Sequence, residues 1–228
     1  MRYAIISDIH GNLEALQAAL EHIETLDVEG IVCLGDVVGY GPDPNECIEL
    51  IRTHCMETVK GNHDAAAIDL METMSMNKLA REAAIWTHER LDPASKEFLM
   101  QLPLKTTIEN ATLVHASPHE PEQWHYIMSN LDAEIAFRHF DTAVCFIGHS
   151  HRPGIFSKNS TEVKKRIINV GSIGQPRDRD PKLSFGVFDT DTLGYENIRL
   201  SYSVETTADK MFSAGLPSEL AERLFYGL

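Results

Sequence analysis

The sequence predicts an α/β fold, and two observations support this prediction. In the first 64 residues, short apolar runs alternate with helical patterns, an order that favours parallel strands joined by right-handed crossovers. After residue 110, apolar runs and helical patterns return, and short turns join several of the later runs. We therefore expect two sheets packed together, with helices on the outside.

The elements of the first half have recognisable ends. Residues 2–7 form an apolar run typical of a buried strand, and Asn12, a favourable helix N-cap, precedes a helix that we expect to end near residue 26. A second strand is predicted at residues 31–35. Pro44 is typical of a first helical position and begins a second helix, which leads to a third strand at residues 58–61.

Residues 65–102 differ from this alternating pattern. The spacing of their apolar side chains predicts two helices, at residues 77–90 and 93–102. We interpret the segment as a helical insertion packed over or beside the sheet. A chain of 228 residues is long enough for one domain or at most two. We expect a single domain over residues 1–228, with this insertion at about 65–102.

The second half contains the remaining predicted elements. Short apolar runs bounded by turn residues indicate strands, and longer patterns of helical spacing indicate helices. The predicted strands span residues 112–114, 144–148, 166–170, 184–189 and 195–202, and the predicted helices span residues 131–139, 207–213 and 218–226. Between the first of these strands and the first helix lies an irregular loop that is rich in histidine and aromatic residues.

The composition argues against several classes of protein. The formal net charge is −14, whereas a broad nucleic-acid surface needs a basic face. No apolar run approaches the ~20 residues that span a bilayer, and the N-terminal residues lack the pattern of a signal peptide. The four cysteines form no C-x-x-C pair, which is typical of reduced, buried thiols. We expect a cytoplasmic protein without membrane contact, and the oligomeric state stays open.

Five of the apolar runs are followed directly by residues whose side chains bind metal ions. In an α/β sheet, ligands gather beyond the carboxyl ends of the strands, so we expect these side chains to meet at one edge. The candidate metal ligands are Asp8, His10, Asp36, Asn62, His115, His149 and His151. Seven oxygen and nitrogen ligands are too many for one ion and suit two divalent ions. Because the set has no thiolate, it favours Mn, Fe, Zn, Ni or Co, and the two oxygens of Asp36 can bridge both ions.

A pair of metal ions points to phosphate chemistry. Two ions held ~3.5–4 Å apart can trap a bridging hydroxide and clamp a phosphate ester for in-line attack. The leaving oxygen then needs a proton, and His63, next to Asn62, is the candidate general acid because histidine titrates near neutral pH. Asp64 is the candidate partner that holds this imidazole in the right tautomer, as a carboxylate does behind a catalytic histidine.

These residues stand in five blocks that resemble the calcineurin-like metallophosphoesterase superfamily. The blocks are Asp8-Ile9-His10, Gly35-Asp36-Val37-Val38-Gly39, Gly61-Asn62-His63-Asp64, Val114-His115 and Gly148-His149-Ser150-His151, and they come in the family order. The resemblance implies a four-layer α/β/β/α sandwich and His63 as the acid, with Asp64 as its partner. It also implies two sets of ligands: Asp8, His10, Asp36 and His151 for one ion, and Asp36, Asn62, His115 and His149 for the other.

Two departures from the motifs of one branch indicate which part of the family this chain resembles. The Ser/Thr protein phosphatase branch carries Gly-Asp-x-Val-Asp-Arg-Gly and Gly-Asn-His-Glu. Here no Asp-Arg follows Val38, and the third block ends in Asp64. The arginine that grips phosphate in that branch is therefore missing at that place. The chain is more similar to the small bacterial and archaeal phosphodiesterase-like members.

Two loops contain further candidates for substrate binding. His119 and Trp124 lie in the irregular loop after a candidate metal ligand, and such loops often shape a substrate pocket. An aromatic side chain there can stack on a base or ring. The alternative is a loop that is fixed by the packing of its own aromatic residues.

The second loop follows the predicted strand at residues 166–170 and contains Arg177 and Arg179. Either guanidinium can bind a substrate phosphate and so replace the arginine missing from the second block. The alternative is a surface ion pair with Asp178 or Asp180, which contributes little.

The sequence predicts a metal-dependent phosphoric ester hydrolase, foremost a phosphodiesterase, in which hydroxide between two ions attacks phosphorus and His63 protonates the leaving group. We expect a small phosphate ester as substrate, with a nucleotide as one candidate. A phosphomonoesterase or a nucleotide pyrophosphohydrolase is the first alternative. A non-catalytic scaffold with this fold is the second alternative, although this chain keeps all seven candidate ligands, His63 and Asp64.

Overall fold

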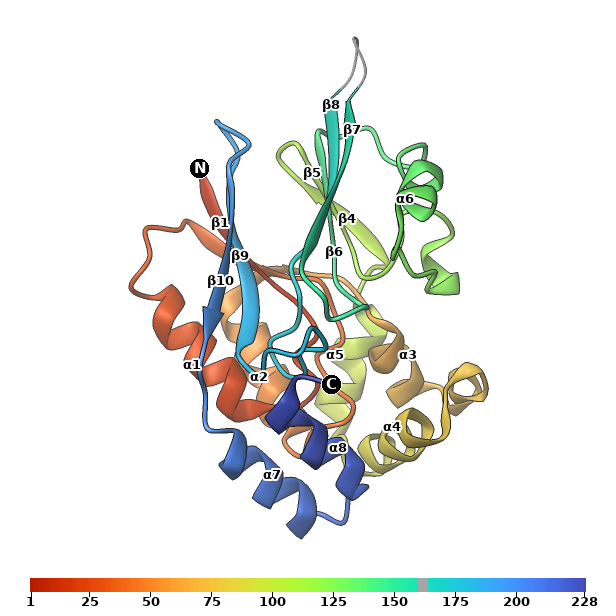
Figure 1. The fold of residues 1–228 in the computed structure, drawn as a ribbon. Helices are drawn as coiled ribbons and strands as arrows, with labels where there is room; N and C mark the ends of the chain where they lie inside the picture. Colours follow the sequence, from red (N-terminus) through yellow and green to blue (C-terminus); the bar gives the residue numbers. More distant parts are fainter. Residues whose placement is uncertain (160–163) are drawn as a thin grey trace.

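The computed structural model describes residues 1–159 and 164–228, which form two five-stranded sheets surrounded by helices (Figure 1). The first sheet has the order β10-β9-β1-β2-β3 and contains β1 (Arg2–Ile6), β2 (Gly30–Cys33), β3 (Cys55–Thr58), β9 (Leu183–Asp189) and β10 (Tyr195–Leu200). The second has the order β4-β5-β6-β8-β7 and contains β4 (Lys105–Ile108), β5 (Ala111–Val114), β6 (Val144–Ile147), β7 (Gly154–Asn159) and β8 (Lys164–Asn169). Strands β1, β2 and β3 run parallel, as do β5, β6 and β8, and the other neighbours pair antiparallel.

The helices are short and lie around the sheets. They are α1 (Leu13–Ile23), α2 (Pro44–His54), α3 (Asn62–Ile68), α4 (Lys78–Arg90), α5 (Pro93–Gln101), α6 (Asn130–Ala136), α7 (Val204–Ser213) and α8 (Ser218–Glu222), with 3-10 helices at Leu70–Ser75, Pro121–Gln123 and Arg223–Tyr226. Within the described ranges, none of them has the length and apolar character that a membrane crossing requires.

A hydrophobic core lies between the two sheets. Along β1 the side chains alternate, so that Tyr3 and Ile5 point into this core while Ala4 and Ile6 point to the opposite face. Phe146 of the second sheet meets Phe188 of the first sheet edge to face, with ring centroids 5.0 Å apart. Burial of these apolar side chains holds the sheets face to face.

Helices cover the outer face of each sheet (Figure 1). On the first sheet, Ile6 packs in one cluster with Leu16 of α1 and Ile48 of α2. On the second sheet, Ile147 packs in another cluster with Ala133 of α6. The order of layers is therefore helix, sheet, sheet, helix, which confirms the predicted α/β/β/α fold class.

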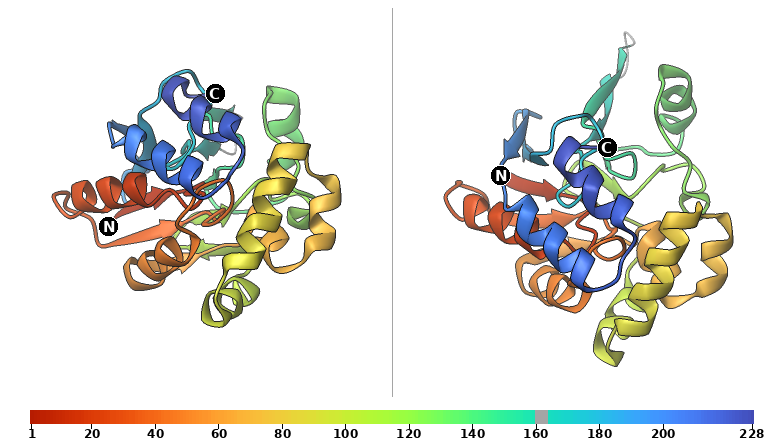
Figure 2. Two further views of the ribbon diagram at one scale, coloured as in Figure 1. Left: turned by 90° about the horizontal axis from the view of Figure 1, so that it is seen from below. Right: turned by 60° about the horizontal axis from the view of Figure 1, so that its bottom comes forward.

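The segment between β3 and β4 is helical, as its sequence predicts. Helices α4 and α5 match the helices predicted at residues 77–90 and 93–102. Ala83 of α4 belongs to one apolar cluster with Met211 of α7 and Leu220 of α8, so this segment and the C-terminal helices lie side by side (Figure 2). The interpretation of residues 65–102 as an insertion into a single domain stays a prediction.

Some boundaries differ from the predicted ones. The third strand comes earlier than residues 58–61, because β3 begins directly after α2 and ends at Thr58. Helix α1 ends at Ile23 rather than near residue 26. The apolar pattern does not predict β4, β7 or α3. Strands β4 and β7 lie at the edges of the second sheet, where a continuous apolar run is not required.

Candidate metal centre

The seven candidate metal ligands converge beyond the ends of strands from both sheets. Strand β1 leads to Asp8 and His10, β2 to Asp36, β3 to Asn62 at the start of α3, β5 to His115, and β6 to His149 and His151. All except Asn62 are buried, and the Oδ1 atom of Asn62 is buried as well. The side chains therefore meet at one place to which strands of both sheets lead, whereas strand-end reasoning alone expects the edge of one sheet.

The ligand atoms form two groups that share Asp36. Within each group the atoms lie within 4.8 Å of one another, and the groups are Asp8, His10, Asp36 and His151, and Asp36, His115 and His149. A carboxylate has two oxygens, so Asp36 can serve both groups. The amide of Asn62 lines the same cavity as His149.

Five of the candidate ligands have left-handed backbone conformations. Asp8, His10, Asp36, His149 and His151 have φ angles between 51° and 63°, a region that residues with a Cβ atom rarely adopt. Such conformations persist where the surrounding structure holds them, and they cluster at functional sites. Here they turn the chain sharply after each strand, which lets two residues of one short turn reach the same centre.

Backbone carbonyls orient three of the histidine rings. The Nδ1 atoms lie close to carbonyl oxygens: His10 to Val38 at 3.1 Å, His115 to Leu34 at 2.8 Å, and His151 to Gln175 at 2.6 Å. A ring whose Nδ1–H donates to a carbonyl keeps Nε2 free to donate an electron pair, which is the usual arrangement of a metal-binding histidine. The Nε2 atoms point toward carboxylates: His151 to Asp8 at 3.2 Å, His115 to Asp36 at 3.3 Å, and His10 to Asp36 at 3.6 Å.

Three ligand-type atoms are buried without a hydrogen-bond partner among the described residues. They are Oδ1 of Asn62, Nε2 of His115 and Nε2 of His149. Buried polar atoms are nearly always paired, so unpaired ones need an explanation. A divalent cation accepts such lone pairs, and a set of carboxylate, imidazole and amide donors suits a first-row transition metal. The residues present therefore fit metal ions.

Charge and burial together set the protonation of this centre. Burial alone raises the pKa of a carboxyl, but the charges of His115 and His63 outweigh it and hold the pKa of Asp36 well below its usual range. Burial lowers the pKa of His115, but the adjacent Asp36 outweighs this effect and raises it to about 9. Burial and the charge of His115 lower the pKa of His149 to about 3. Asp36 is therefore ionised at neutral pH, as a cation site requires.

His63 lies in the first turn of α3, beside this centre. Its ring Nδ1 has no hydrogen-bond partner in the part of the chain that the structure describes. The Asp64 carboxylate accepts hydrogen bonds from the backbone N–H of Val38 at 3.2 Å and of Gly61 at 3.0 Å. Both oxygens of Asp64 are thus used by the backbone. Asp64 therefore fixes the turn and the loop around His63, and no hydrogen bond to the ring of His63 is among its contacts in the described ranges.

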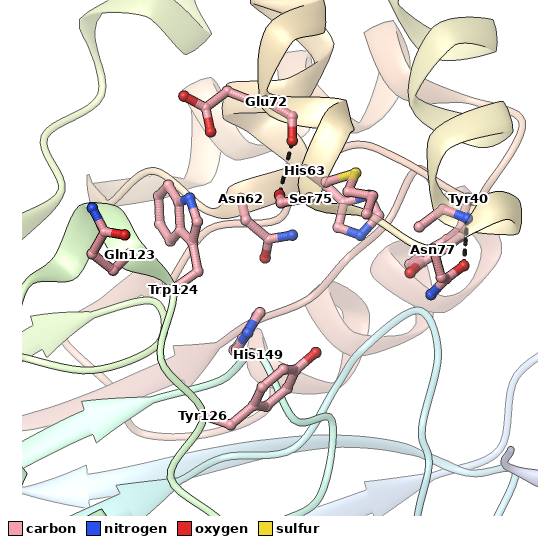
Figure 3. A pocket seen from close by; sticks show the side chains of 12 residues that line it. Tyr40, Asn62, His63, Glu72, Ser75, Asn77, Gln123, Trp124, Tyr126 and His149 are labelled. Atoms are coloured by element: carbon pink, nitrogen blue, oxygen red, sulfur yellow. Dashed lines mark hydrogen bonds between the residues drawn. The ribbon is translucent and has the colours of Figure 1, made fainter.

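A cavity of about 410 Å³ opens beside the candidate metal centre (Figure 3). It is lined by Tyr40, Asn62, His63, Glu72, Ser75, Met76, Asn77, Ala80, Gln123, Trp124, Tyr126 and His149. Figure 3 shows Asn62 and His63 between Trp124 on one side and Tyr40 on the other. The ring of Tyr126 stacks on His149, with centroids 4.0 Å apart. The volume is within the range of pockets that bind small molecules.

Two of the four candidates for substrate binding lie in the loop after β5. Trp124 lines the cavity, whereas His119 is not one of its lining residues. The ring of His119 stacks on His139 with centroids 4.2 Å apart, and a second stack joins it to His125 at 5.8 Å. His119 therefore packs on His139, which follows α6, and on His125 of its own loop, whereas Trp124 lines the cavity.

The two arginine candidates differ in position. The half-buried Arg177 lies near the site, with its guanidinium carbon 5.6 Å from the ring centre of Tyr40. Arg179 is exposed, and its backbone N–H donates to the carbonyl of Gly227 at 2.9 Å. Arg199, rather than either candidate, pairs with the acids of this loop, reaching Asp178 at 2.6 Å and Asp180 at 3.5 Å.

Residues 1–193 of the chain match a family model whose description is Calcineurin-like phosphoesterase superfamily domain. The chain belongs to that family. The family match, together with the fold, confirms the resemblance carried by the five sequence blocks.

Relatives of this metallophosphoesterase occur in bacteria and archaea. An uncharacterized protein of Methanocaldococcus jannaschii is 38% identical over 239 residues, which cover 98% of this chain and 97% of that protein. The crystal structure of a metallophosphoesterase from Sphaerobacter thermophilus is 38% identical, with a TM-score of 0.89 over 100% of this chain and 99% of that chain. A hypothetical protein from Pyrococcus horikoshii shares the fold at 23% identity, with a TM-score of 0.88 over 100% and 98% of the two chains.

Several residues of the metallophosphoesterase site lie outside the motifs. Tyr126 has a sequence signal, because it stands in the same aromatic loop as Trp124. Glu72, Ser75 and Asn77 have none, because they belong to the helical segment and reach the cavity through the tertiary fold. Short local patterns do not reveal contacts of this kind.

Proposed function

We propose that this metallophosphoesterase holds two divalent transition-metal ions and hydrolyses small phosphate esters, foremost diesters. The sharing of Asp36 between two groups of converging ligand atoms carries the proposal. One group is Asp8, His10, Asp36 and His151, and the other is Asp36, Asn62, His115 and His149. The donor types suit Mn, Fe, Zn, Ni or Co.

The proposed reaction adds water across a P–O bond. When bound, the ions supply a nucleophilic water at neutral pH and neutralise charge on the phosphate. The water oxygen bonds to phosphorus, the ester P–O bond breaks, and the leaving oxygen takes the electron pair of that bond and a proton. His63, on the cavity side of the centre, donates this proton. Burial lowers the pKa of its imidazole to about 4, so the negative charge of the bound phosphate has to favour the protonated ring. Asp64 keeps His63 in place by binding the backbone N–H groups of Val38 and Gly61.

The cavity supports the choice of a diester. A volume of about 410 Å³ next to His63 gives room for the two organic groups of a diester, whereas a monoester carries only one. Trp124 offers a ring face on which a base or another planar group can stack, and this favours a nucleotide-like substrate. A phosphomonoesterase or a nucleotide pyrophosphohydrolase is the alternative.

Hydrolysis of two p-nitrophenyl compounds tests the proposal. The protein is stripped with a chelator, reloaded separately with Mn, Fe, Co, Ni or Zn, and assayed with bis-p-nitrophenyl phosphate and p-nitrophenyl phosphate. We expect metal-dependent cleavage of the diester at a higher kcat/KM than the monoester. A preference for the monoester would favour the phosphatase alternative. Bound metal without turnover of either compound would favour a non-catalytic scaffold.

A further inference from the structure

Two arginines from distant parts of the chain meet beside Tyr40. Arg177 comes from the loop after β8, and Arg223 begins the 3-10 helix near the C-terminus. Their guanidinium carbons lie 5.6 Å and 4.7 Å from the ring centre of Tyr40. The Nη2 atoms of both donate to the same oxygen, Oε1 of Gln175, at 2.7 Å and 2.6 Å. Two positive charges are therefore held next to each other.

These two charges have no acidic partner within the described ranges. No carboxylate oxygen there lies within 4.0 Å of a nitrogen of Arg177 or Arg223, and the Nε atom of each is buried without a hydrogen-bond partner. Arg199 provides the contrast, since Asp178 and Asp180 both pair with it. A guanidinium has five N–H donors, and one shared amide oxygen leaves most of them unused.

Such an arrangement is unfavourable unless something offsets it. Like charges repel, and taking a charge out of water costs free energy unless the charge is paired. The chain as a whole carries a formal charge of −14, so acidic residues are plentiful, yet none is placed here. The pair therefore has the properties of a site for an external anion.

The pair lies on the side of the proposed general acid. The ring of Tyr40, which both guanidinium groups approach, lies 4.3 Å from the ring of His63 and 4.7 Å from that of His10. Neither arginine lines the cavity of about 410 Å³, but both approach Tyr40, which does, so an anion bound by them would stand at the Tyr40 end of that cavity, near His63.

We propose that Arg177 and Arg223 bind a second phosphate of the substrate, carried by the leaving group. This inference rests on the proposed phosphoesterase function, and among its substrates it favours those of the nucleotide pyrophosphohydrolase alternative, which carry adjacent phosphates, as in a nucleoside polyphosphate. The planar fork of a guanidinium matches two phosphate oxygens at once, which a lysine cannot do. In such a substrate the bridging P–O bond breaks, and the leaving phosphate keeps the oxygen and its electron pair.

A purely structural role is the competing explanation. Through Gln175, the two arginines also connect the C-terminal 3-10 helix to the loop after β8. In that case their removal lowers the stability of the fold but does not change the preference between one phosphate and two.

Binding of two phosphonates by calorimetry separates these explanations. Methylphosphonate carries one phosphonate group, and methylenediphosphonate carries two that resemble adjacent phosphates but do not hydrolyse. Both are titrated into the manganese-loaded protein, and the metal content of each variant is measured. The variants are Arg177→Gln, Arg223→Gln and Arg223→Lys. Arg90→Gln is the matched control, because Arg90 also packs on an aromatic ring, 4.0 Å from the centre of Trp86, outside the site.

We expect the wild type to bind methylenediphosphonate about tenfold more tightly than methylphosphonate, as charge-assisted hydrogen bonds to one more phosphate allow. Arg177→Gln and Arg223→Gln should lose this preference, Arg223→Lys should keep part of it, and Arg90→Gln should keep all of it. Equal affinity for both ligands in the wild type would overturn the inference. An unchanged preference in both glutamine variants, with lower melting temperatures, would assign the pair a structural role.

The outcome is independent of the test of the proposed function. Binding does not require turnover, so loss of the preference in the variants would support the anion site even if bis-p-nitrophenyl phosphate were not hydrolysed. Conversely, hydrolysis of that diester without a preference for two phosphates would leave the phosphoesterase proposal standing and refute the second phosphate site.

Discussion

The backbone N–H of His63 donates a hydrogen bond to Oδ1 of Asp36 at 2.8 Å. This bond joins the first turn of α3 to the carboxylate that belongs to both groups of candidate ligands. The position of the proposed acid and the position of the proposed bridging ligand therefore depend on each other. A change at Asp36 should affect metal binding and the placement of His63 together.

Replacement of Asp36 tests the shared carboxylate. Asp36→Asn removes a negative charge from both groups, so we expect the protein to retain less than two ions and kcat/KM for the diester to fall more than about 100-fold. Metal analysis of the purified variant and steady-state kinetics measure the two effects. Asp27→Asn is the control, because Asp27 is exposed and belongs to neither group of candidate ligands. Full metal content and activity in Asp36→Asn would refute the proposed role.

Replacement of His63 tests the general acid. General acid catalysis contributes typically about 10²–10⁴-fold, and most of it is needed when the leaving group is a poor one. We expect His63→Gln to lower kcat for an alkyl phosphodiester by about this factor and to affect bis-p-nitrophenyl phosphate much less, because p-nitrophenolate leaves without a proton. The metal content should stay at the wild-type level. An equal loss for both leaving groups would contradict the role of acid.

Removal of metal should lower the thermal stability. A ligand that binds the folded state at a free concentration of 100 Kd stabilises it by about 2.7 kcal/mol. For a chain of this length, we expect a chelator to lower the melting temperature by roughly 5–10 °C and added metal to restore it. Differential scanning calorimetry measures the shift. The Asp36→Asn variant should respond less, and an identical melting temperature of wild type with chelator and with metal would argue against a metal site.

Gly174 should be essential for the loop that carries Asp8 and His10. A Cβ atom at this position would lie 1.8 Å from the carbonyl oxygen of Ile9, so the backbone has to move. We expect Gly174→Ala to cost about 1–3 kcal/mol of unfolding free energy and to weaken metal binding. Gly154→Ala is the matched control, because no atom lies within 4 Å of its Cβ position. Urea unfolding and metal titration compare the two variants, and equal behaviour would contradict the argument.

Two tyrosines should make the fold sensitive to alkaline pH. Burial raises the pKa of Tyr195 and of Tyr202 to about 12. The unfolded chain releases these protons near pH 10, so between about pH 10 and 12 the folded state binds more protons and stability falls as pH rises. Each tyrosine contributes a slope of at most about 1.4 kcal/mol per pH unit.

Urea unfolding between pH 9 and 11.5 measures this slope. Tyr195→Phe and Tyr202→Phe should each make it shallower, while the exposed Tyr226→Phe should leave it unchanged. A wild-type slope in both Tyr195→Phe and Tyr202→Phe would show that other groups determine the alkaline behaviour.

Much of the fold follows from local patterns. The alternation along β1 places Tyr3 and Ile5 on one face and Ala4 and Ile6 on the other, and this period of two is visible in the sequence. Edge strands are different. β7 pairs on one side with β8, so it lacks the apolar run by which a central strand is predicted. Helix α3 is hidden for another reason, since its seven residues include the motif of Asn62, His63 and Asp64.

The features of the candidate site likewise divide into those that the sequence predicts and those that only the tertiary structure shows. The residue types after each strand, and their order, are properties of the sequence, because a ligand of the right chemistry must stand at the end of a strand. The pairing of Arg223 with Gln175, across 48 positions of the chain, is not, because no local pattern links these residues. The role expected for Asp64, as the partner of the His63 ring, also requires a contact between these two side chains. Residues that are adjacent in sequence do not necessarily make such a contact.

By itself, then, the sequence determined the α/β class and the set of side chains able to hold metal, since periodicity and residue chemistry are local properties. The tertiary structure decided which of these side chains share Asp36, which residues line the cavity, and that Arg177 and Arg223 lie together without an acid. The physical reason is that such contacts depend on how the two sheets and the C-terminal helices pack, and packing brings together residues that are far apart along the chain.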